Sequence, residues 1–233
     1  VAAILIEPVQ GEGGYHPAPP AFLRALRALC DEHGIMLILD EVQCGVARTG
    51  KLYAYEHYGI TPDIMATAKG IGGGFPLAAV CGPREIMRHF DPALEGTPDY
   101  VWQTGTLNGN PIAATAGLAT LRELARPGTY ERLHRMGARL RDGLAAAARR
   151  RGLAAQVSGE PPVFDILFTD RPIVDYRATL TADPAMIRRF NQACLRRGLV
   201  KAVNKIYVSL ALTDADCDEI LQIFDDALAA VAS

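Results

Sequence analysis

The sequence predicts an α/β fold with a largely parallel sheet, followed by a smaller α+β domain. In the first half, apolar runs of strand length alternate with helical patterns, and the runs are continuously apolar, as in parallel strands buried on both faces. From residue 111 the composition changes to Ala- and Arg-rich helix before strands return. We therefore expect a large-domain portion at residues 1–115, and linking helices with a small domain at residues 116–233.

In the first half, continuous apolar segments predict the strands and 3.6-residue periodicity predicts the helix. The expected strands cover residues 1–7, 35–40, 63–68 and 77–81. A helix over residues 21–33 places Phe22, Leu26 and Leu29 on one face and ends at Gly34. A Gly- and Pro-rich loop over residues 8–20 separates this helix from the first strand.

In the second half the same signals predict a mixed set of helices and strands. The expected helices cover residues 112–125, 130–151 and 184–197, and the expected strands cover residues 154–158, 163–169, 199–203 and 206–210. Thr213 and Asp216 have the spacing of a capping box, so a final helix is expected to begin there. Its apolar stripe consists of Cys217, Ile220, Leu221, Phe224, Leu228 and Val231.

Composition excludes several classes of protein. The chain has 233 residues, 49% hydrophobic and 21% charged, which is enough to form a core and excludes disorder. A net charge of -2 gives no electrostatic reason to expect a nucleic-acid or membrane partner. The apolar runs are shorter than the ~20 residues of a membrane span. We expect a soluble, cytoplasmic protein with a small-molecule partner, and no metal site, because the Cys and His residues lack ligand spacing. The first strand begins without an initiating Met, so we expect that the natural beginning is missing.

Lys69 is the first residue with potential chemistry. It is one of four lysines, and it lies between an apolar strand and the glycine-rich segment of residues 70–74. Burial at such a position would lower the pKa of the amine, as a lysine that forms a Schiff base requires. The alternative is a surface lysine before a glycine turn, which the spacing alone favours.

Two further segments are candidates for ligand binding. Asp40 ends a fully apolar strand, where a buried carboxylate needs a partner such as a protonated pyridine nitrogen; the alternative is a cap for the following turn. Residues 103–111 place hydroxyls and glycine amides before a helix, which suits an anion; the alternative is an ordinary capped loop. Residues 70–74 do not match a nucleotide-binding fingerprint, so an NAD-type dehydrogenase is a distant alternative.

Four segments carry a family resemblance. They are EPVQGEGG at residues 7–14, DEVQ at 40–43 with RTG at 48–50, Lys69 with GGGFP at 72–76, and GTLNGNP at 105–111. Together, in this order, they resemble the class III (omega) aminotransferases, which are fold-type I enzymes that use pyridoxal 5'-phosphate (PLP). The resemblance covers essentially the whole chain, although family members carry about as much chain again before this start.

The resemblance implies roles for individual residues. Lys69 would form the internal aldimine and move the proton between substrate and cofactor, while Asp40 would keep the pyridine nitrogen protonated. Val42 would pack on the cofactor ring and Gln43 would bind its phenolic oxygen.

The remaining implied roles concern the phosphate, the subunits and the substrate. Thr106, with Gly105 beside it, resembles the threonine that reaches the cofactor phosphate of a neighbouring subunit, which implies a homodimer. Glu7 would lie on the substrate side. The substrates would be an amine or amino acid and an aldehyde or keto acid.

The subfamily stays open on sequence grounds. The first hundred residues resemble the ornithine and 4-aminobutyrate branch, whereas residues 105–111 and 163–213 resemble glutamate-1-semialdehyde 2,1-aminomutase. Branches that bind a dicarboxylate commonly place an arginine in the late strands, where this chain has only Lys201 and Lys205. A substrate carboxylate would then be held elsewhere or by a lysine.

Departures from the family pattern leave further alternatives. Cys44 and the Val46–Ala47 pair stand where a threonine and a Phe-Gly pair are usual, so the substrate wall is expected to differ. The alternatives to an aminotransferase are an aminomutase, a decarboxylase or racemase of the same fold type, and a non-catalytic fragment or subunit of a split aminotransferase.

Overall fold

The computed structural model describes residues 1–232, which form two compact units. The first unit comprises Val1–Pro8, Ala18–Val46 and Lys51–Arg126, and the second comprises Val9–Pro17, Ala47–Gly50 and the chain from Pro127 onward. Helix α3 (Pro111–Leu124), which crosses the predicted boundary at residue 115, lies in the first unit. No helix among residues 1–232 is both long and apolar enough to cross a membrane.

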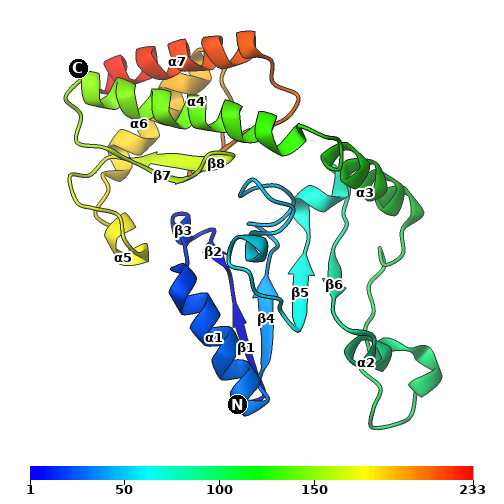
Figure 1. Ribbon diagram of the computed structural model, residues 1–233. Helices are drawn as coiled ribbons and strands as arrows, with labels where there is room; N and C mark the ends of the chain where they lie inside the picture. The colour runs from blue at the N-terminus through cyan, green and yellow to red at the C-terminus, as the bar shows by residue number, and fades with distance from the viewer. Residues whose placement is uncertain (233) are drawn as a thin grey trace. The chain divides into compact units, whose positions relative to one another are not determined.

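The sheet of the first unit has the strand order β1-β4-β5-β6 (Figure 1). Its strands are β1 (Ala3–Ile6), β4 (Met36–Asp40), β5 (Ile64–Thr67) and β6 (Ala79–Cys81). Strands β1, β4 and β5 are parallel, and β6 is antiparallel to β5. The predicted fold, with a largely parallel sheet built from these four strands, is therefore confirmed.

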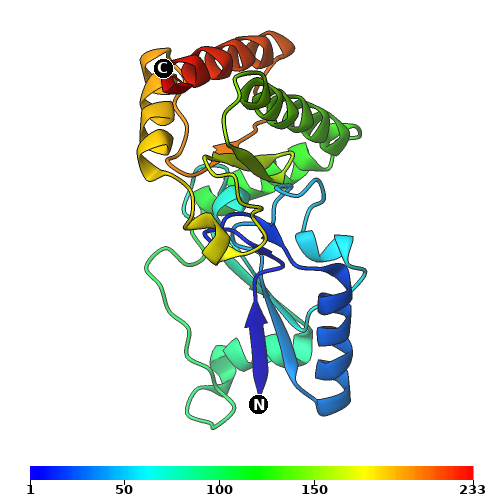
Figure 2. The ribbon, with the colours of Figure 1, turned by 90° about the vertical axis from the view of Figure 1, so that its left-hand side faces the viewer.

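Helix α1 (Pro20–His33) runs alongside β1 and β4 and packs on the sheet (Figure 2). The core between them consists of Leu23, Cys30, Leu37, Leu39, Tyr58 and Ile60, with Leu26 partly buried against it. The predicted face of this helix is confirmed for Leu26 and wrong for Phe22 and Leu29, which are 47% and 44% exposed. Two apolar stripes share the helical period here, and the stripe one residue further along the chain faces the sheet.

Shorter elements complete the first unit. They are the 3₁₀ helices η1 (Ala54–His57), η2 (Lys69–Gly72), η3 (Arg88–Phe90) and η4 (Pro92–Leu94), and the α-helix α2 (Arg84–Met87). These are too short to give a periodic sequence signal, so the sequence did not predict them.

The second unit combines two antiparallel sheets with a helical layer. Its elements are β2 (Val9–Gln10), β3 (His16–Pro17), α4 (Thr129–Arg150), β7 (Gln156–Glu160), β8 (Val163–Leu167), α5 (Tyr176–Thr179), α6 (Pro184–Arg196), β9 (Ile206–Tyr207) and α7 (Asp214–Ala232). β2 pairs with β3, and the other sheet has the order β7-β8-β9. The short β2–β3 pair lies in the segment that was expected to be a loop.

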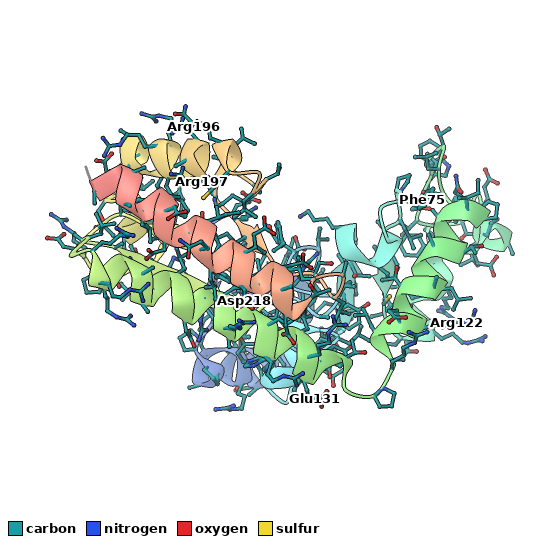
Figure 3. The ribbon with its side chains drawn as sticks, turned by 90° about the horizontal axis from the view of Figure 1, so that it is seen from above. Phe75, Arg122, Glu131, Arg196, Arg197 and Asp218 are labelled. Atoms are coloured by element: carbon teal, nitrogen blue, oxygen red, sulfur yellow. The ribbon has the colours of Figure 1, made fainter. Side chains whose placement is uncertain are left out.

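Helix α7 packs against both α4 and α6 (Figure 3). Aromatic rings meet in this core: the centroid of Phe190 on α6 lies 6.0 Å from that of Phe168, just after β8, and 6.1 Å from that of Phe224 on α7. The predicted capping box is confirmed, because the Asp216 carboxylate accepts from Thr213 N and the Thr213 hydroxyl accepts from Asp216 N. The predicted smaller α+β domain is thus built as expected in this part of the chain.

The strand predicted at residues 199–203 is wrong. Lys201 is buried, and its Nζ donates to the carbonyl oxygens of Ala202 (2.9 Å) and Val203 (3.2 Å) and to Asn191 Oδ1 (2.9 Å). Since these backbone carbonyls bind a side chain, they do not bind a neighbouring strand. The segment forms only a bridge between Ala202 and Lys205.

Asp165 is the ionic partner of Lys201 in this core. The side chain lies on β8, and its Oδ1 is 3.3 Å from Lys201 Nζ. Oδ1 accepts no hydrogen bond within residues 1–232. Burial raises the pKa of Asp165 to about 6, while the charge of Lys201 opposes that shift.

We predict that Asp165 makes the protein more stable as the pH falls. Because the pKa is higher in the folded state, the stabilisation is complete below pH ~4 and is lost as the pH rises through about 6. The effect is roughly 3 kcal/mol across this interval. Asp165→Asn removes it, so the difference in unfolding free energy between wild type and variant, measured by urea denaturation from pH 4 to 8, should change with pH. A constant difference would contradict the prediction.

Candidate active site

The parallel register brings three predicted site residues to one edge of the sheet. Asp40 ends β4 and lies opposite Ala66 of β5, which leads directly to Lys69. Glu7 follows β1, whose last residue lies opposite Leu39. Since the carboxyl ends of parallel strands share an edge, Glu7, Asp40 and Lys69 all lie there.

Lys69 occupies a strained backbone position. It begins η2 with φ of +53°, in the left-handed region that costs an L-residue about 1–2 kcal/mol. Its side chain is exposed, and its ammonium has no hydrogen-bond or ion-pair partner in the described part of the chain. Strain of this kind is concentrated at functional sites, because the surrounding structure must enforce it.

Close packing on helix α3 enforces the position of this loop. Gly73 ends η2 with φ of +57°, and a Cβ there would lie 2.5 Å from Thr120 Oγ1. A Cβ on Gly117 of α3 would lie 3.1 Å from the carbonyl oxygen of Ile71. Phe75, just beyond the loop, lies beside the first turns of α3 (Figure 3). The loop that carries Lys69 therefore packs tightly on α3 at two glycines.

Asp40 is half-buried and shapes the turn that follows it. Its Oδ1 accepts from Val42 N at 2.9 Å, so the capping role considered for this residue is present for one oxygen. Oδ2 accepts no hydrogen bond among residues 1–232 and can serve another donor. The turn continues to Val46, which has φ of +55° and packs against Gly70, where a Cβ would lie 3.4 Å from the valine side chain.

A cavity of about 750 Å³ lies in the first unit beside these strand ends. It is lined by Val42, Ala66, Thr67, Ala68, Pro76, Leu77, Ala78, Ala79, Val80, Phe90, Gln103, Leu107, Asn108 and Gly109. Of the predicted site residues, Val42 is in this lining, and Ala68 immediately precedes Lys69. The other predicted residues are outside the lining as the structure describes it: Asp40, Gln43, Gly105, Thr106, Glu7 and Lys69 itself.

The segment considered for anion binding is a capped loop in this structure. Gly105 and Thr106 are exposed, and Asn108 N donates to the carbonyl oxygen of Gly105. The side chain of Asn110 accepts from Ile112 N (2.9 Å) and Ala113 N (3.1 Å), so it caps α3. Two helix N–H groups are thus satisfied within the chain, and Thr106 stays available on the surface.

Sequence reasoning missed Glu41, the residue between Asp40 and Val42. It is fully buried, whereas its neighbours on either side are half-buried. A second carboxylate directly after an apolar strand was the available signal, since a buried carboxylate requires several donors. Two of those donors, Ala54 N and Tyr55 N, come from a segment further along the chain.

The class-III aminotransferase family model matches residues 1–228. The chain belongs to this family. Its members are PLP-dependent, and one similar solved structure is a transaminase with PLP bound, with a TM-score of 0.85 and 30% identity.

Individual class-III relatives cover nearly all of this chain. Glutamate-1-semialdehyde 2,1-aminomutase 2 of Brevibacillus brevis is 40% identical over 95% of the chain and 51% of its own length. The 4-aminobutyrate aminotransferase GabT of Escherichia coli is 42% identical over 97% of the chain and 53% of its own length. The omega-transaminase of Sphaerobacter thermophilus superposes with a TM-score of 0.90 and 35% identity, over 99% of this chain and 52% of that one. The chain spans about half the length of these relatives, and the predicted fold type I is confirmed.

We predict that Gly73→Ala destabilises this class-III chain more than Gly59→Ala does. Both glycines have left-handed backbones, with φ of +57° and +66°, so both variants carry a similar strain of about 1 kcal/mol. Only Gly73 meets Thr120 at 2.5 Å, whereas a Cβ on Gly59 meets nothing within 4 Å. We expect a further loss of about 1–3 kcal/mol for Gly73→Ala in denaturant titrations. Equal losses for the two variants would show that the loop does not pack closely on α3.

Proposed function

We propose that the protein to which this chain belongs is a PLP-dependent aminotransferase. The observation that carries the proposal is the exposed, strained Lys69 at the sheet edge that Asp40 also occupies. It would transfer an amino group between an amine or amino acid and an aldehyde or keto acid.

The residues present are compatible with PLP. The cofactor needs a primary amine for its aldehyde, and the amine of Lys69 has no partner among residues 1–232. Its pyridinium N–H needs a carboxylate, and Asp40 Oδ2 has no donor in the same range. The cavity of about 750 Å³, which Val42 and Ala68 line while Asp40 and Lys69 do not, is within the usual size range of small-molecule sites. When bound, PLP would supply an electron sink for negative charge at the substrate carbon.

The chain's own side chains would bind, orient and move protons. The amine of Lys69 would take a proton from the substrate α-carbon and pass it to the cofactor. The Asp40 carboxylate would hold the proton on the pyridine nitrogen by charge and hydrogen bonding. Val42 would pack against the ring and Gln43 would donate to the phenolic oxygen, as the family resemblance implies. Glu7, at the same sheet edge, would face the substrate.

Lys201 and Lys205 of the second unit are the lysines considered for binding a substrate carboxylate. Lys201 is committed to Asn191 and two carbonyls and is paired with Asp165, so it does not serve a substrate carboxylate. Lys205 forms an ion pair with Glu12, whose side chain is 79% exposed. Both lysines are thus engaged within the second unit.

We also propose a homodimer with shared active sites. Thr106 is exposed, and it lies in a segment with exposed apolar residues, including Trp102 (75%), Leu107 (53%) and Ile112 (63%). An apolar surface of this kind favours coverage by a partner. In the dimer Thr106, with Gly105, would reach the cofactor phosphate of the neighbouring subunit.

A second candidate function is an aminomutase reaction. Aminomutases and GabT are equally similar to this chain, at 40–42% and 42% identity, so the degree of identity does not separate them. A half-reaction experiment distinguishes the two functions. An aminotransferase mixed with an amino donor alone releases one keto acid or aldehyde per site, whereas an aminomutase returns an isomer of its substrate.

We predict that Lys69→Ala lowers the rate of amino-group transfer by about 100-fold or more, because proton transfer by a positioned amine contributes at least that factor. Borohydride reduction with PLP should fix a pyridoxyl group on Lys69, and peptide mapping locates it. Lys51→Ala is the matched control, since Lys51 is also an exposed lysine of the first unit and, within residues 1–232, its Nζ donates only to the carbonyl of Glu56.

The outcomes separate the proposals. Normal turnover by Lys69→Ala would reject the role assigned to this lysine. Wild-type protein that shows no change in absorbance on titration with PLP would instead support a non-catalytic fragment or subunit.

A further inference from the structure

Glu41 connects three parts of the first unit. Its backbone N donates to the carbonyl oxygen of Ala66 on β5 at 2.9 Å, and its backbone carbonyl accepts from Gly45 N at 2.9 Å. Its side-chain oxygens accept from Ala54 N (3.0 Å) and Tyr55 N (2.8 Å) of η1. The residue thereby joins the strand before Lys69, the turn after Asp40 and the η1 helix.

The turn itself also binds the Glu41 side chain. The Cys44 thiol donates to Oε2 at 3.0 Å, so both carboxylate oxygens are occupied. Gly45 permits this arrangement, because a Cβ there would lie 2.6 Å from the Glu41 carbonyl oxygen. The turn after Glu41 is thus held by two of its groups: the carboxylate binds Cys44 and the backbone carbonyl binds Gly45.

The charge of this carboxylate is stabilised by neutral donors. Burial raises the pKa of Glu41 above its ordinary value, and the hydrogen bonds from Cys44, Ala54 and Tyr55 oppose that shift. A buried carboxylate with this donor set is costly to disturb, because removing one donor or acceptor leaves a buried polar group unsatisfied. Its geometry is therefore well fixed.

From this geometry we propose that Glu41 is the positioning residue for the cofactor-facing side chains on either side of it. Side chains alternate along β4, so with Glu41 held in the interior Asp40 faces the other way. Val42, in the turn that Glu41 anchors, lines the cavity. The hydrogen bond from Val42 N to Asp40 Oδ1 then fixes the carboxylate relative to the turn. This inference rests on the proposed PLP site and adds a residue that does not itself touch the cofactor.

The test compares Glu41→Gln with Glu56→Ala in the protein that carries this chain. Ala54 N and Tyr55 N donate to different oxygens of Glu41, so a glutamine in the same pose places an NH2 donor where one of these oxygens now accepts and one hydrogen bond is lost. Glu56 accepts from Tyr53 N at 2.8 Å and caps the same η1 helix from its exposed side. Glu56→Ala therefore loosens η1 without touching the turn after Asp40, which makes it the matched control.

PLP affinity, measured by absorbance titration, and thermal unfolding without PLP are the two readouts. We expect Glu41→Gln to weaken PLP binding about tenfold and Glu56→Ala to leave it within about twofold, even if both lower the melting temperature. Equal weakening by the two variants, or unchanged PLP affinity in Glu41→Gln, overturns the proposal. Wild-type protein that binds no PLP would reject the proposed function itself, which is a separate outcome.

A milder pair of variants applies if Glu41→Gln does not fold. Cys44→Ser keeps a donor to Glu41 Oε2, and Cys44→Ala removes it. We expect Cys44→Ala to weaken PLP binding about threefold and Cys44→Ser to bind like wild type. The same affinity for the serine and alanine variants would contradict the positioning role.

Discussion

The parallel register of β1, β4 and β5 is the constraint on which the candidate site depends. It brings Glu7, Asp40 and Lys69 to one edge, although they are far apart in the chain. Side chains alternate along a strand, so a slip of one residue would turn Asp40 into the interior and expose Glu41. The burial of Leu37 and Leu39 against α1 opposes that slip, because it would expose both leucines. The apolar core thus determines which carboxylate reaches the edge.

Glu41 extends this constraint beyond the last strand residue. An apolar core can fix β4 only as far as apolar residues continue, and the chain then enters a turn. Beyond that point the buried carboxylate of Glu41 accepts hydrogen bonds from η1. Because hydrogen bonds are directional, they fix the position of the chain as apolar packing does within the strand. Val46 continues the arrangement by packing on Gly70, next to Lys69. The turn after β4 and the loop after β5 are therefore coupled by contacts at both ends.

Local patterns predicted the strands and the residues at their ends, because apolar runs and glycine positions carry that information. The buried face of α1 was not predictable from the helix alone, since two apolar stripes compete and the sheet selects one. The segment at residues 199–203 has the composition of a strand, but Lys201 forms an ion pair with Asp165. Asp165 is distant in sequence, so the segment's own composition does not reveal this contact. Glu41 was missed for a related reason: its main donors are backbone N–H groups, which carry no residue-type signal.

The strain at Lys69 is informative when it is compared with Gly73 in the same loop. Both residues have left-handed backbones, with φ of +53° and +57°. At Gly73 the chain uses the residue that adopts this conformation without steric cost. At Lys69 a glycine would also remove the strain, yet the chain has a lysine whose ammonium makes no hydrogen bond or ion pair among residues 1–232. The proposed amino-transfer chemistry therefore gives a reason for a lysine at this position that the contacts within residues 1–232 do not supply.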